Sequence, residues 1–419
     1  MILYANLRIK AAVAYDRLGA DVVKIEASFF IAFLFLIACL NTNFFYLIDD
    51  NSIPISDITI VFELLFGVLV FLFVSKNKKK LPFKWLYLMP IALAVTSSYM
   101  ASINYDQPIQ YGFRAQRGWL VACLMIFPVF RLLSSGKIKK EDLLRISDFV
   151  AFILICLATV QIILTDHFTF MHVMTNERYG AARIYIDTSF ILFSYFSHLS
   201  NLIKFKKARK IDYFYIVLTW FEQFFITKSR MSLMELLVAT LLALCVMKLN
   251  GKKLVASGIT VFLFALVLNT PYGQMILTSL SGSALHGAGE TIRLVGKDFY
   301  LDKLGDTKSN TLFGCGYVNI DWPTAYSRSR YGEGIFYNDN GIVGLMFYYG
   351  LFFLLWMVTL SIVLLVYAYK LKEYGCFLYI ICTLIGFYSL FPYCYVNNLS
   401  FAFVISICLY KSKLVGVGR

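Results

Sequence analysis

The chain has 419 residues, of which 59% are hydrophobic, 17% are aromatic and only 15% are charged, and its formal net charge is +14. This composition, with a mean hydropathy of +0.69, excludes a soluble domain of this size, because soluble domains carry a larger share of charged residues. A membrane-spanning helix takes about 20 apolar residues, and many segments of that length lie between short polar breaks. We therefore predict an all-α, polytopic integral membrane protein.

The predicted elements form four consecutive parts. Residues 1–27 lack the apolar core and cleavage site of a secretory signal and are predicted to be a cytoplasmic segment. Residues 28–270 hold nine predicted spans, residues 271–340 form one large polar loop, and residues 341–419 hold three further spans and a tail. The twelve spans are predicted at 28–48, 56–75, 85–103, 118–134, 146–165, 184–203, 211–227, 231–247, 254–270, 341–368, 375–391 and 394–410.

The distribution of lysine and arginine predicts which span ends face the cytoplasm. Twenty-seven of the 39 Lys and Arg residues fall at one set of alternating span ends, including the runs at 76–84 and 204–210. Cytoplasmic loops carry the excess of these residues, so both termini are predicted to be cytoplasmic and the large loop to lie on the outer side. The net charge is therefore mostly a signal of topology, and nucleic-acid binding is not needed to explain it.

Several of the remaining basic residues form close pairs on the outer side, against the normal bias. The pairs are Arg114 with Arg117, Arg178 with Arg183, and Lys228 with Arg230, and the large loop adds Arg293. One such pair is best interpreted as solvated or snorkelling side chains. Three pairs and a further arginine together predict an anion site, because guanidinium groups bind phosphate oxygens with two parallel hydrogen bonds. At the membrane–water boundary the predicted anion is a lipid-linked diphosphate.

The large loop supplies the other candidate site residues. Residues 288–304 have the spacing of an amphipathic helix that could lie in the interface, with Arg293 and Lys297 on its polar face. Candidate general bases are Asp302, Asp306, Asp321, Glu333, Asp339 and His286. Asp339 is preferred because it directly precedes the tenth predicted span. No metal or cofactor is predicted, because metal-ligand spacing and nucleotide-binding motifs are absent from the sequence.

Acidic residues are few within the predicted spans, and no Lys or Arg remains for the span interiors. A transporter usually places cations or proton-relay acids there, so this pattern argues against one. Glu222 and Glu235 are interpreted as ion-pair partners of the nearby Lys228 and Arg230. For Glu63, an interhelix hydrogen bond and a functional proton site remain equal alternatives.

Three short motifs occur in a characteristic order. The segment 225–233 reads Phe-Ile-Thr-Lys-Ser-Arg-Met-Ser-Leu, and Arg293 is followed by Leu-Phe-Gly-Cys-Gly-Tyr at 312–317. The segment 338–344 reads Asn-Asp-Asn-Gly-Ile-Val-Gly and runs into Phe-Tyr-Tyr-Gly-Leu at 347–351. With some twelve spans and one large late loop, this pattern resembles the O-antigen polymerase and ligase superfamily of bacterial envelope glycosyltransferases.

The resemblance implies a fold of the GT-C type in the bacterial inner membrane, with a periplasmic active site. It implies metal-independent transfer of a growing glycan from an undecaprenyl-diphosphate-linked donor to a second lipid-linked repeat unit. The outer cations would then bind the diphosphate, and Asp339 or Glu333 would serve as base. A chain-length-determining co-polymerase is an implied partner. The sequence departs from the ligases, which have a His-Asn pair where this chain reads Tyr337-Asn338-Asp339-Asn340.

We therefore expect an O-antigen or polysaccharide polymerase. A ligase that transfers glycan to lipid A core is the first alternative, and the missing histidine argues against it. A lipid-linked oligosaccharide transporter is the second alternative, and the cation-free span interiors argue against it. A membrane scaffold without catalytic activity is the last, and it leaves the outer arginine pairs without a reason.

Overall fold

The computed structural model of the chain is 80% helical, which confirms the predicted all-α class. It describes residues 27–49, 53–74, 80–165, 167–178, 181–203, 209–246, 288–386 and 399–411. Its helices are Ala27–Asn41, α2 (Asn43–Tyr46), α3 (Ile55–Phe73), α4 (Lys84–Tyr105), α5 (Ile109–Leu124), α6 (Ile126–Ser135), α7 (Lys140–Leu164), α8 (Ser189–Ile203), α9 (Lys210–Phe221), the π-helix η1 (Glu222–Thr227), α10 (Arg230–Val246), α13 (Ala288–Gly305), α14 (Lys308–Phe313), α15 (Pro323–Arg328), the 3-10 helices η2 (Tyr331–Glu333) and η3 (Tyr337–Asn340), α16 (Gly341–Lys370), α17 (Tyr374–Gly386) and α18 (Leu399–Leu409). Strands β1 (Thr175–Arg178) and β2 (Ala181–Ile184) form an antiparallel hairpin.

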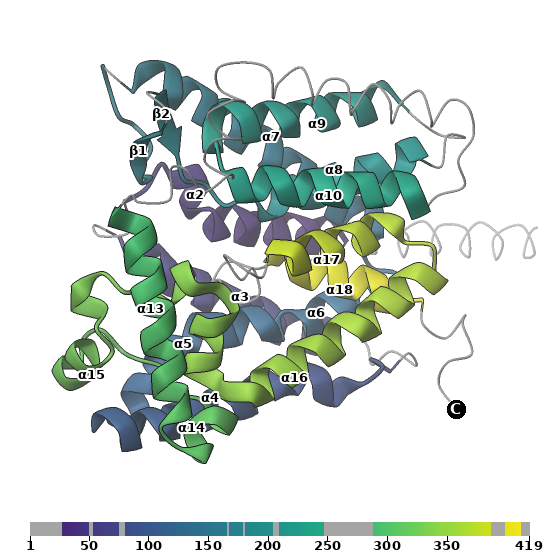
Figure 1. Cartoon of the computed structure of the whole chain (residues 1–419). Helices are drawn as coiled ribbons and strands as arrows, with labels where there is room; N and C mark the ends of the chain where they lie inside the picture. The colour runs from purple at the N-terminus through teal and green to yellow at the C-terminus, as the bar shows by residue number, and fades with distance from the viewer. Residues whose placement is uncertain are drawn as a thin grey trace, which may run out of the picture.

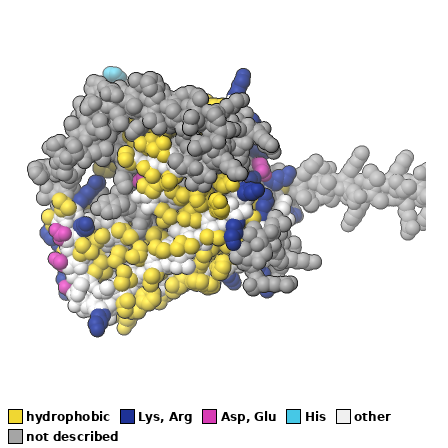
Figure 2. Space-filling model, turned by 45° about the vertical axis from the view of Figure 1, so that its right-hand side comes forward, with side chains coloured by type: hydrophobic (Ala, Val, Ile, Leu, Met, Phe, Trp, Pro, Cys, Tyr) yellow, Lys and Arg dark blue, Asp and Glu magenta, His cyan; other side chains and the backbone are white. Residues whose placement is uncertain are grey.

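Within the described residues, five helical segments are long and apolar enough to cross a membrane, and each overlaps a predicted span. They are α3, α4, the α5–α6 segment Ile109–Ser135, α7 and α16. Figure 2 shows a broad hydrophobic surface with Lys and Arg side chains on both sides of it, as expected for a surface that faces lipid. The chain is thus a membrane protein. The predicted span 254–270 lies outside the described residues, and the count of twelve stays a prediction.

The sixth predicted span begins later in the structure than hydropathy indicates. Residues that were expected at its start form strand β2 and a short connection, and α8 begins only at Ser189. The carboxylate of Asp187 accepts a hydrogen bond from the backbone N–H of Ser189 at 2.7 Å, which satisfies one of the free donors at the helix start. The connection between hairpin and helix is therefore fixed by a side chain that hydropathy does not detect.

The helices pack as two groups joined by the C-terminal ones (Figure 1). In one group α8 contacts both α7 and α9, and in the other α4 contacts α5 and α16. Between them, α17 contacts α8, α10 and α16, and α18 packs on α6 and α16. Every side chain of α18 is buried, so this helix forms the centre of the core. Helix α13 runs across one end of the bundle, at a steep angle to the long helices, and the hairpin and α15 lie at the same end (Figure 1).

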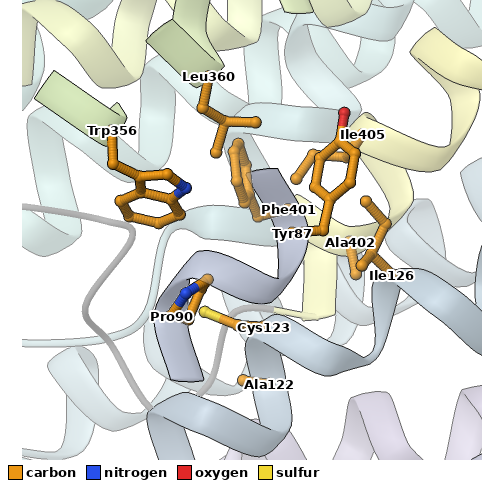
Figure 3. A pocket seen from close by; sticks show the side chains of 10 residues that line it. All are labelled: Tyr87, Pro90, Ala122, Cys123, Ile126, Trp356, Leu360, Phe401, Ala402 and Ile405. Carbon is orange, nitrogen blue, oxygen red and sulfur yellow. The ribbon is translucent and has the colours of Figure 1, made fainter. Parts of the chain in front are cut away.

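A proline in the middle of α4 is compensated by a tryptophan of α16. Pro90 has no N–H, so the carbonyl of Leu86, four residues earlier, lacks its usual helical donor. The indole N–H of Trp356 donates to that carbonyl at 2.7 Å, and the bond is buried. Figure 3 shows both side chains at a small apolar cavity of about 30 Å³ between α4, α5, α6, α16 and α18. The bond thus couples α4 to α16 beneath the large loop.

We expect Trp356→Phe to lower the free energy of unfolding by about 1–3 kcal/mol, because the buried carbonyl of Leu86 loses its donor. Pro90→Ala restores a backbone N–H at the right position, so the same Trp356→Phe change should cost less in that background. Thermal unfolding of the four proteins of this double-mutant cycle in detergent measures the difference. Equal costs in both backgrounds would contradict the assignment.

Candidate functional site

The hairpin and the turn before α10 lie against each other. The π-helix η1 ends at Thr227, and the left-handed backbone of the next residue, Lys228 (φ 47°), turns the chain into α10. The Nζ of Lys228 donates to the carbonyl of Ala182 in strand β2 at 2.5 Å. Lys228 and the hairpin that carries Arg178 and Arg183 are therefore brought together, as the predicted anion site requires. The side chains of Arg178 and Arg230 lie outside the described part.

Arg183 and Lys228 have different surroundings. Arg183 lies over the ring of Tyr185, with its guanidinium carbon 4.0 Å from the ring centroid and its Nη1 2.9 Å from the hydroxyl. Lys228 is 8% exposed, and burial lowers the pKa of its ammonium from the ordinary 10.5. A partly desolvated cation interacts strongly with an anion that enters its surroundings. We refer to Arg178, Arg183, Lys228 and Arg230 as the hairpin cluster.

The arginine pair on α5 has a different environment. Arg117 forms an ion pair with Asp57 of α3, in which its Nε lies 3.0 Å from Oδ1, and its Nη1 donates to the carbonyl of Arg114 at 2.7 Å. The side chains of Arg117 and Asp57 are 43% and 50% exposed. Arg114 is exposed as well. Arg117 thus neutralises a carboxylate of the protein, and Arg114 is the member of this pair that suits a ligand better.

Arg293 lies on α13, which packs along the segment that holds Asp339. One turn later on α13, a Cβ at Gly296 would contact the side-chain nitrogen of Asn340 at 2.8 Å. The hydroxyl of Tyr300 donates to the carbonyl of Ile335 at 3.2 Å, which fixes the next turn of α13 on the same stretch. Arg293 is exposed, and the side chain of Asp339 lies outside the described part. The structure thus places the elements of these two predicted site residues side by side.

The glycines of the large loop allow it to dock on the spans. At Gly314 and Gly316 the backbone has positive φ, at 80° and 98°, and a Cβ at Gly316 would overlap the backbone of Ala101 in α4. The next contact is to α16, which is interrupted at Gly350 (φ 71°). A Cβ at Gly350 would overlap the carbonyl of Leu312. The N–H of Cys315 donates to the carbonyl of Phe347 at 2.6 Å. The Gly-Cys-Gly motif and Gly350 are therefore two halves of one backbone contact.

Two side chains of α4 and Gln107, which follows α4, hydrogen-bond to the loop and to α16. Ser97 donates to the carbonyl of Tyr348 at 2.8 Å, and Asn104 donates to the carbonyl of Cys315 at 3.0 Å. Gln107 donates to the carbonyl of Tyr317 at 3.0 Å and accepts from the N–H of Asn319 at 2.8 Å. The bonds from Asn104 and Gln107 pair the polar backbone of the loop, which would otherwise lose its hydrogen bonds to water on the apolar helices. The segment 314–319 of the large loop is therefore held on α4 and α16 by backbone and side-chain hydrogen bonds.

Glu333 is tied to a neighbouring arginine. Its carboxylate accepts from Nε of Arg330 at 2.8 Å, and the guanidinium of Arg330 lies 5.5 Å from the ring centroid of Phe299. The hydrogen bond from Arg330 holds the pKa of Glu333 below its ordinary value of 4.5. A carboxylate with a lowered pKa is a weaker base than an isolated glutamate. This arrangement favours Asp339 over Glu333 as the proton acceptor.

We expect Glu333→Gln to leave the rate of the glycosyl transfer predicted from the sequence, and its pH profile near neutrality, close to wild type. The hydrogen bond from Arg330 lowers the pKa of Glu333 and occupies one of its oxygens, so this carboxylate is a poor proton acceptor. Loss of a true general base would instead slow the reaction about 100-fold or more. A rate measured from pH 5 to pH 9 for both proteins distinguishes the two results.

The structure shows the hydrogen-bond partners of two acidic residues, Glu222 and Glu63. The carboxylate of Glu222 accepts from the amide of Gln223 at 2.7 Å, and its other oxygen, Oε1, is buried without a hydrogen-bond partner among the described residues. Among the described side chains Glu222 thus has no ion-pair partner, and because the side chain of Arg230 lies outside the described part, its predicted ion pair stays a prediction. Glu63 accepts from the amide of Asn41 at 3.2 Å, which provides the interhelix hydrogen bond that was one of its two alternatives.

Asp187 lies between the hairpin and α8 and was not among the predicted site residues. It is a half-buried carboxylate four residues after Arg183, and its backbone N–H donates to the hydroxyl of Tyr46 at 2.8 Å. Hydropathy predicted that Asp187 lies inside a span. The signal in the sequence was an acidic residue within an apolar segment. Among the described residues no three His, Cys, Asp or Glu side chains are grouped to hold a metal ion.

A scan against models of known protein families finds no match, and a search of curated proteins finds no significant relative. The likeness to the O-antigen polymerase and ligase superfamily therefore rests on the three motifs alone. What the structure adds is a physical reason for their positions. The Thr-Lys-Ser-Arg turn contacts the hairpin, and the Gly-x-Gly motif contacts the interruption of α16.

Proposed function

We propose that the chain is a glycosyltransferase that polymerises lipid-linked oligosaccharide repeat units on the periplasmic face of a bacterial inner membrane. The observation that carries the proposal is the contact of Lys228 with strand β2, which brings the turn that holds Lys228 and Arg230 against the hairpin that holds Arg178 and Arg183. A cluster of Arg and Lys at a membrane–water boundary suits the diphosphate of a polyprenyl carrier. Helix α13, which crosses the same end of the bundle, supplies Arg293 (Figure 1).

The proposed reaction is one displacement at the anomeric carbon of the donor glycan. A hydroxyl of the acceptor repeat unit attacks this carbon, a new glycosidic C–O bond forms, and the bond to the diphosphate oxygen breaks. Asp339 accepts the hydroxyl proton. Arg183, Lys228 and Arg230 stabilise the negative charge that develops on the leaving undecaprenyl diphosphate. Such a displacement inverts the anomeric centre.

The docking of the large loop on α4 and α16 serves to position the substrates in this mechanism. Transfer requires the acceptor hydroxyl within about 3–3.5 Å of the anomeric carbon, so the groups that hold the two substrates need a fixed separation. Asp339 lies in η3, directly before α16, and the bonds from Ser97, Asn104 and the Gly-Cys-Gly motif hold this region on α4. We infer that the docked loop sets the position of the base relative to the diphosphate site.

The proposal is tested by the glycan banding of a deletion strain complemented with variants at matched membrane expression. Arg230→Ala and, separately, Asp339→Ala should reduce a ladder of chain lengths to a single repeat unit on the lipid core. Lys370→Ala is the control, because it removes an exposed cation from the far end of α16. Loss of all attached glycan, with polymer left on the lipid carrier, would indicate a ligase. An unchanged ladder from both variants would refute the proposed site.

A further inference from the structure

A second cavity, lined mostly by polar and charged residues, lies at the other end of α8 from the hairpin. It has a volume of about 400 Å³ and is enclosed by the first turns of α7, the last turns of α8 and the first turns of α9. The start of α7 is fixed near the C-terminal end of α16 by an ion pair of Lys140 with Glu373, at 3.0 Å. In the topology predicted from lysine and arginine, this end faces the cytoplasm. The cavity is thus separate from the hairpin cluster.

The floor of the cavity is a buried histidine between two carboxylates. Nδ1 of His198 lies 2.7 Å from Oδ1 of Asp212, and Nε2 lies 3.1 Å from Oδ1 of Asp148. Carboxylates only accept hydrogen bonds, so both contacts are satisfied when His198 carries a proton on each nitrogen. Ser194 donates to the same oxygen of Asp148 at 2.5 Å, and the ring of Tyr215 stacks on the imidazole at 4.6 Å. This network joins α7, α8 and α9 into a preformed polar floor.

The mouth of the cavity carries two arginines beside apolar surface. The side chains of Arg145 and Arg209 are 81% and 68% exposed, and their ion pairs to Asp142 and Asp212 are loose, at 3.7 and 3.8 Å. Next to them, Phe149 and Ile211 are 49% and 43% exposed. Exposed guanidinium groups suit a phosphate, and exposed apolar side chains of a membrane protein face acyl chains.

We propose that this cavity binds the headgroup of an anionic phospholipid that carries a polyol, of the phosphatidylglycerol class. Arg145 and Arg209 hold the phosphate, and the headgroup hydroxyls donate to the carboxylates of Glu141 and Asp148, which also line the cavity. The acyl chains lie along Phe149. The binding site joins three helices, so its occupation stabilises their arrangement.

The surrounding charge favours this lipid over a zwitterionic one. Exposed Lys139 directly precedes α7, and exposed Lys210 is the first residue of α9, beside the two arginines. A phosphatidylethanolamine headgroup would bring its own ammonium into this positive region. A polyol supplies donors to the carboxylates without adding positive charge, and basic pockets between helices on the cytoplasmic side commonly bind anionic headgroups.

Native mass spectrometry of the delipidated full chain in neutral detergent tests the proposal. Phosphatidylglycerol should bind the wild type at least about tenfold more tightly than phosphatidylethanolamine, and Arg145→Gln/Arg209→Gln should remove this difference. Lys370→Gln, which removes an exposed cation from the same end outside the cavity, should bind like the wild type. Equal binding of both lipids by the wild type, or an unchanged preference in the double variant, would overturn the proposal.

Two further comparisons identify the headgroup and the source of the phosphate. Phosphatidic acid lacks the polyol and should bind more weakly than phosphatidylglycerol, and the exposed Glu141→Gln variant should reduce that difference. Soluble glycerol phosphate should not compete at equal concentration, because it makes no contact with Phe149. Equal competition by glycerol phosphate would show a soluble phosphate site instead and would overturn the lipid assignment.

Discussion

Replacing Lys228 with glutamine is expected to reduce glycosyl transfer about 100-fold or more in a protein that still folds. The ammonium of Lys228 is 8% exposed and lies at the hairpin, where the proposed leaving group gains negative charge. Removal of one preorganised charged donor from such a site commonly costs a factor of about 100 to 1,000 in rate. The measurement is the rate of product formation from a lipid-linked donor by purified protein of matched melting temperature.

The pH dependence separates the electrostatic role of Lys228 from its hydrogen bond to Ala182. Burial lowers the pKa of Lys228, so its positive charge is complete below the lowered pKa and is lost as pH rises through it, before an ordinary lysine at 10.5 would titrate. Wild-type transfer should therefore decline on the alkaline side. Lys228→Arg keeps its charge there, so its decline should move to higher pH. An identical alkaline profile for both proteins would show that Lys228 only holds the hairpin.

Replacing Gly316 with alanine is expected to destabilise the protein by about 3 kcal/mol or more. Its positive φ of 98° strains any L side chain, and a Cβ there would overlap the backbone of Ala101, which cannot move away like a flexible side chain. The large loop would then separate from α4, and Asp339 would lose its fixed position. Thermal unfolding in detergent and the rate of transfer should both be strongly reduced.

Two other glycines provide matched controls for this change. Gly334 also has positive φ (80°) but has open space where a Cβ would lie, so Gly334→Ala should cost only about 1–2 kcal/mol from backbone strain. Gly67 lies inside α3 with no atom in the way, so Gly67→Ala should be neutral or stabilising by up to about 1 kcal/mol. If Gly316→Ala costs no more than Gly334→Ala, the close approach to α4 is not the reason for this glycine.

Hydropathy and charge predicted the parts of the fold that depend on local sequence. The spans at 56–75, 85–103 and 341–368 correspond to α3, α4 and α16, because a continuous apolar run has few alternatives to a membrane helix. The amphipathic helix at 288–304 corresponds to α13 (Ala288–Gly305), since its spacing is also a local property. The Gly-Cys-Gly motif was singled out for close approach, and the structure shows which backbone it approaches.

Features that depend on contacts between distant residues could not be predicted. His198 was placed in a span by its apolar neighbours, and its partners Asp148 and Asp212 belong to two other helices. The ion pair expected for Glu222 rested on closeness in sequence, and the hydrogen bond that the structure shows for this side chain is to Gln223 of the π-helix. The contact of Lys228 with the hairpin joins segments 46 residues apart, so the pairing of two cation-bearing loops became visible only in the structure.

Reconstitution of the purified chain in liposomes with undecaprenyl-diphosphate-linked repeat units tests the central claim most directly. The account predicts a ladder of lipid-linked glycans, with one undecaprenyl diphosphate released for each bond formed, in the presence of a metal chelator. Lys228→Gln should yield little polymer under the same conditions, and Lys370→Gln should match the wild type. Movement of intact repeat units across the bilayer without any new glycosidic bond would contradict the account and indicate a transporter.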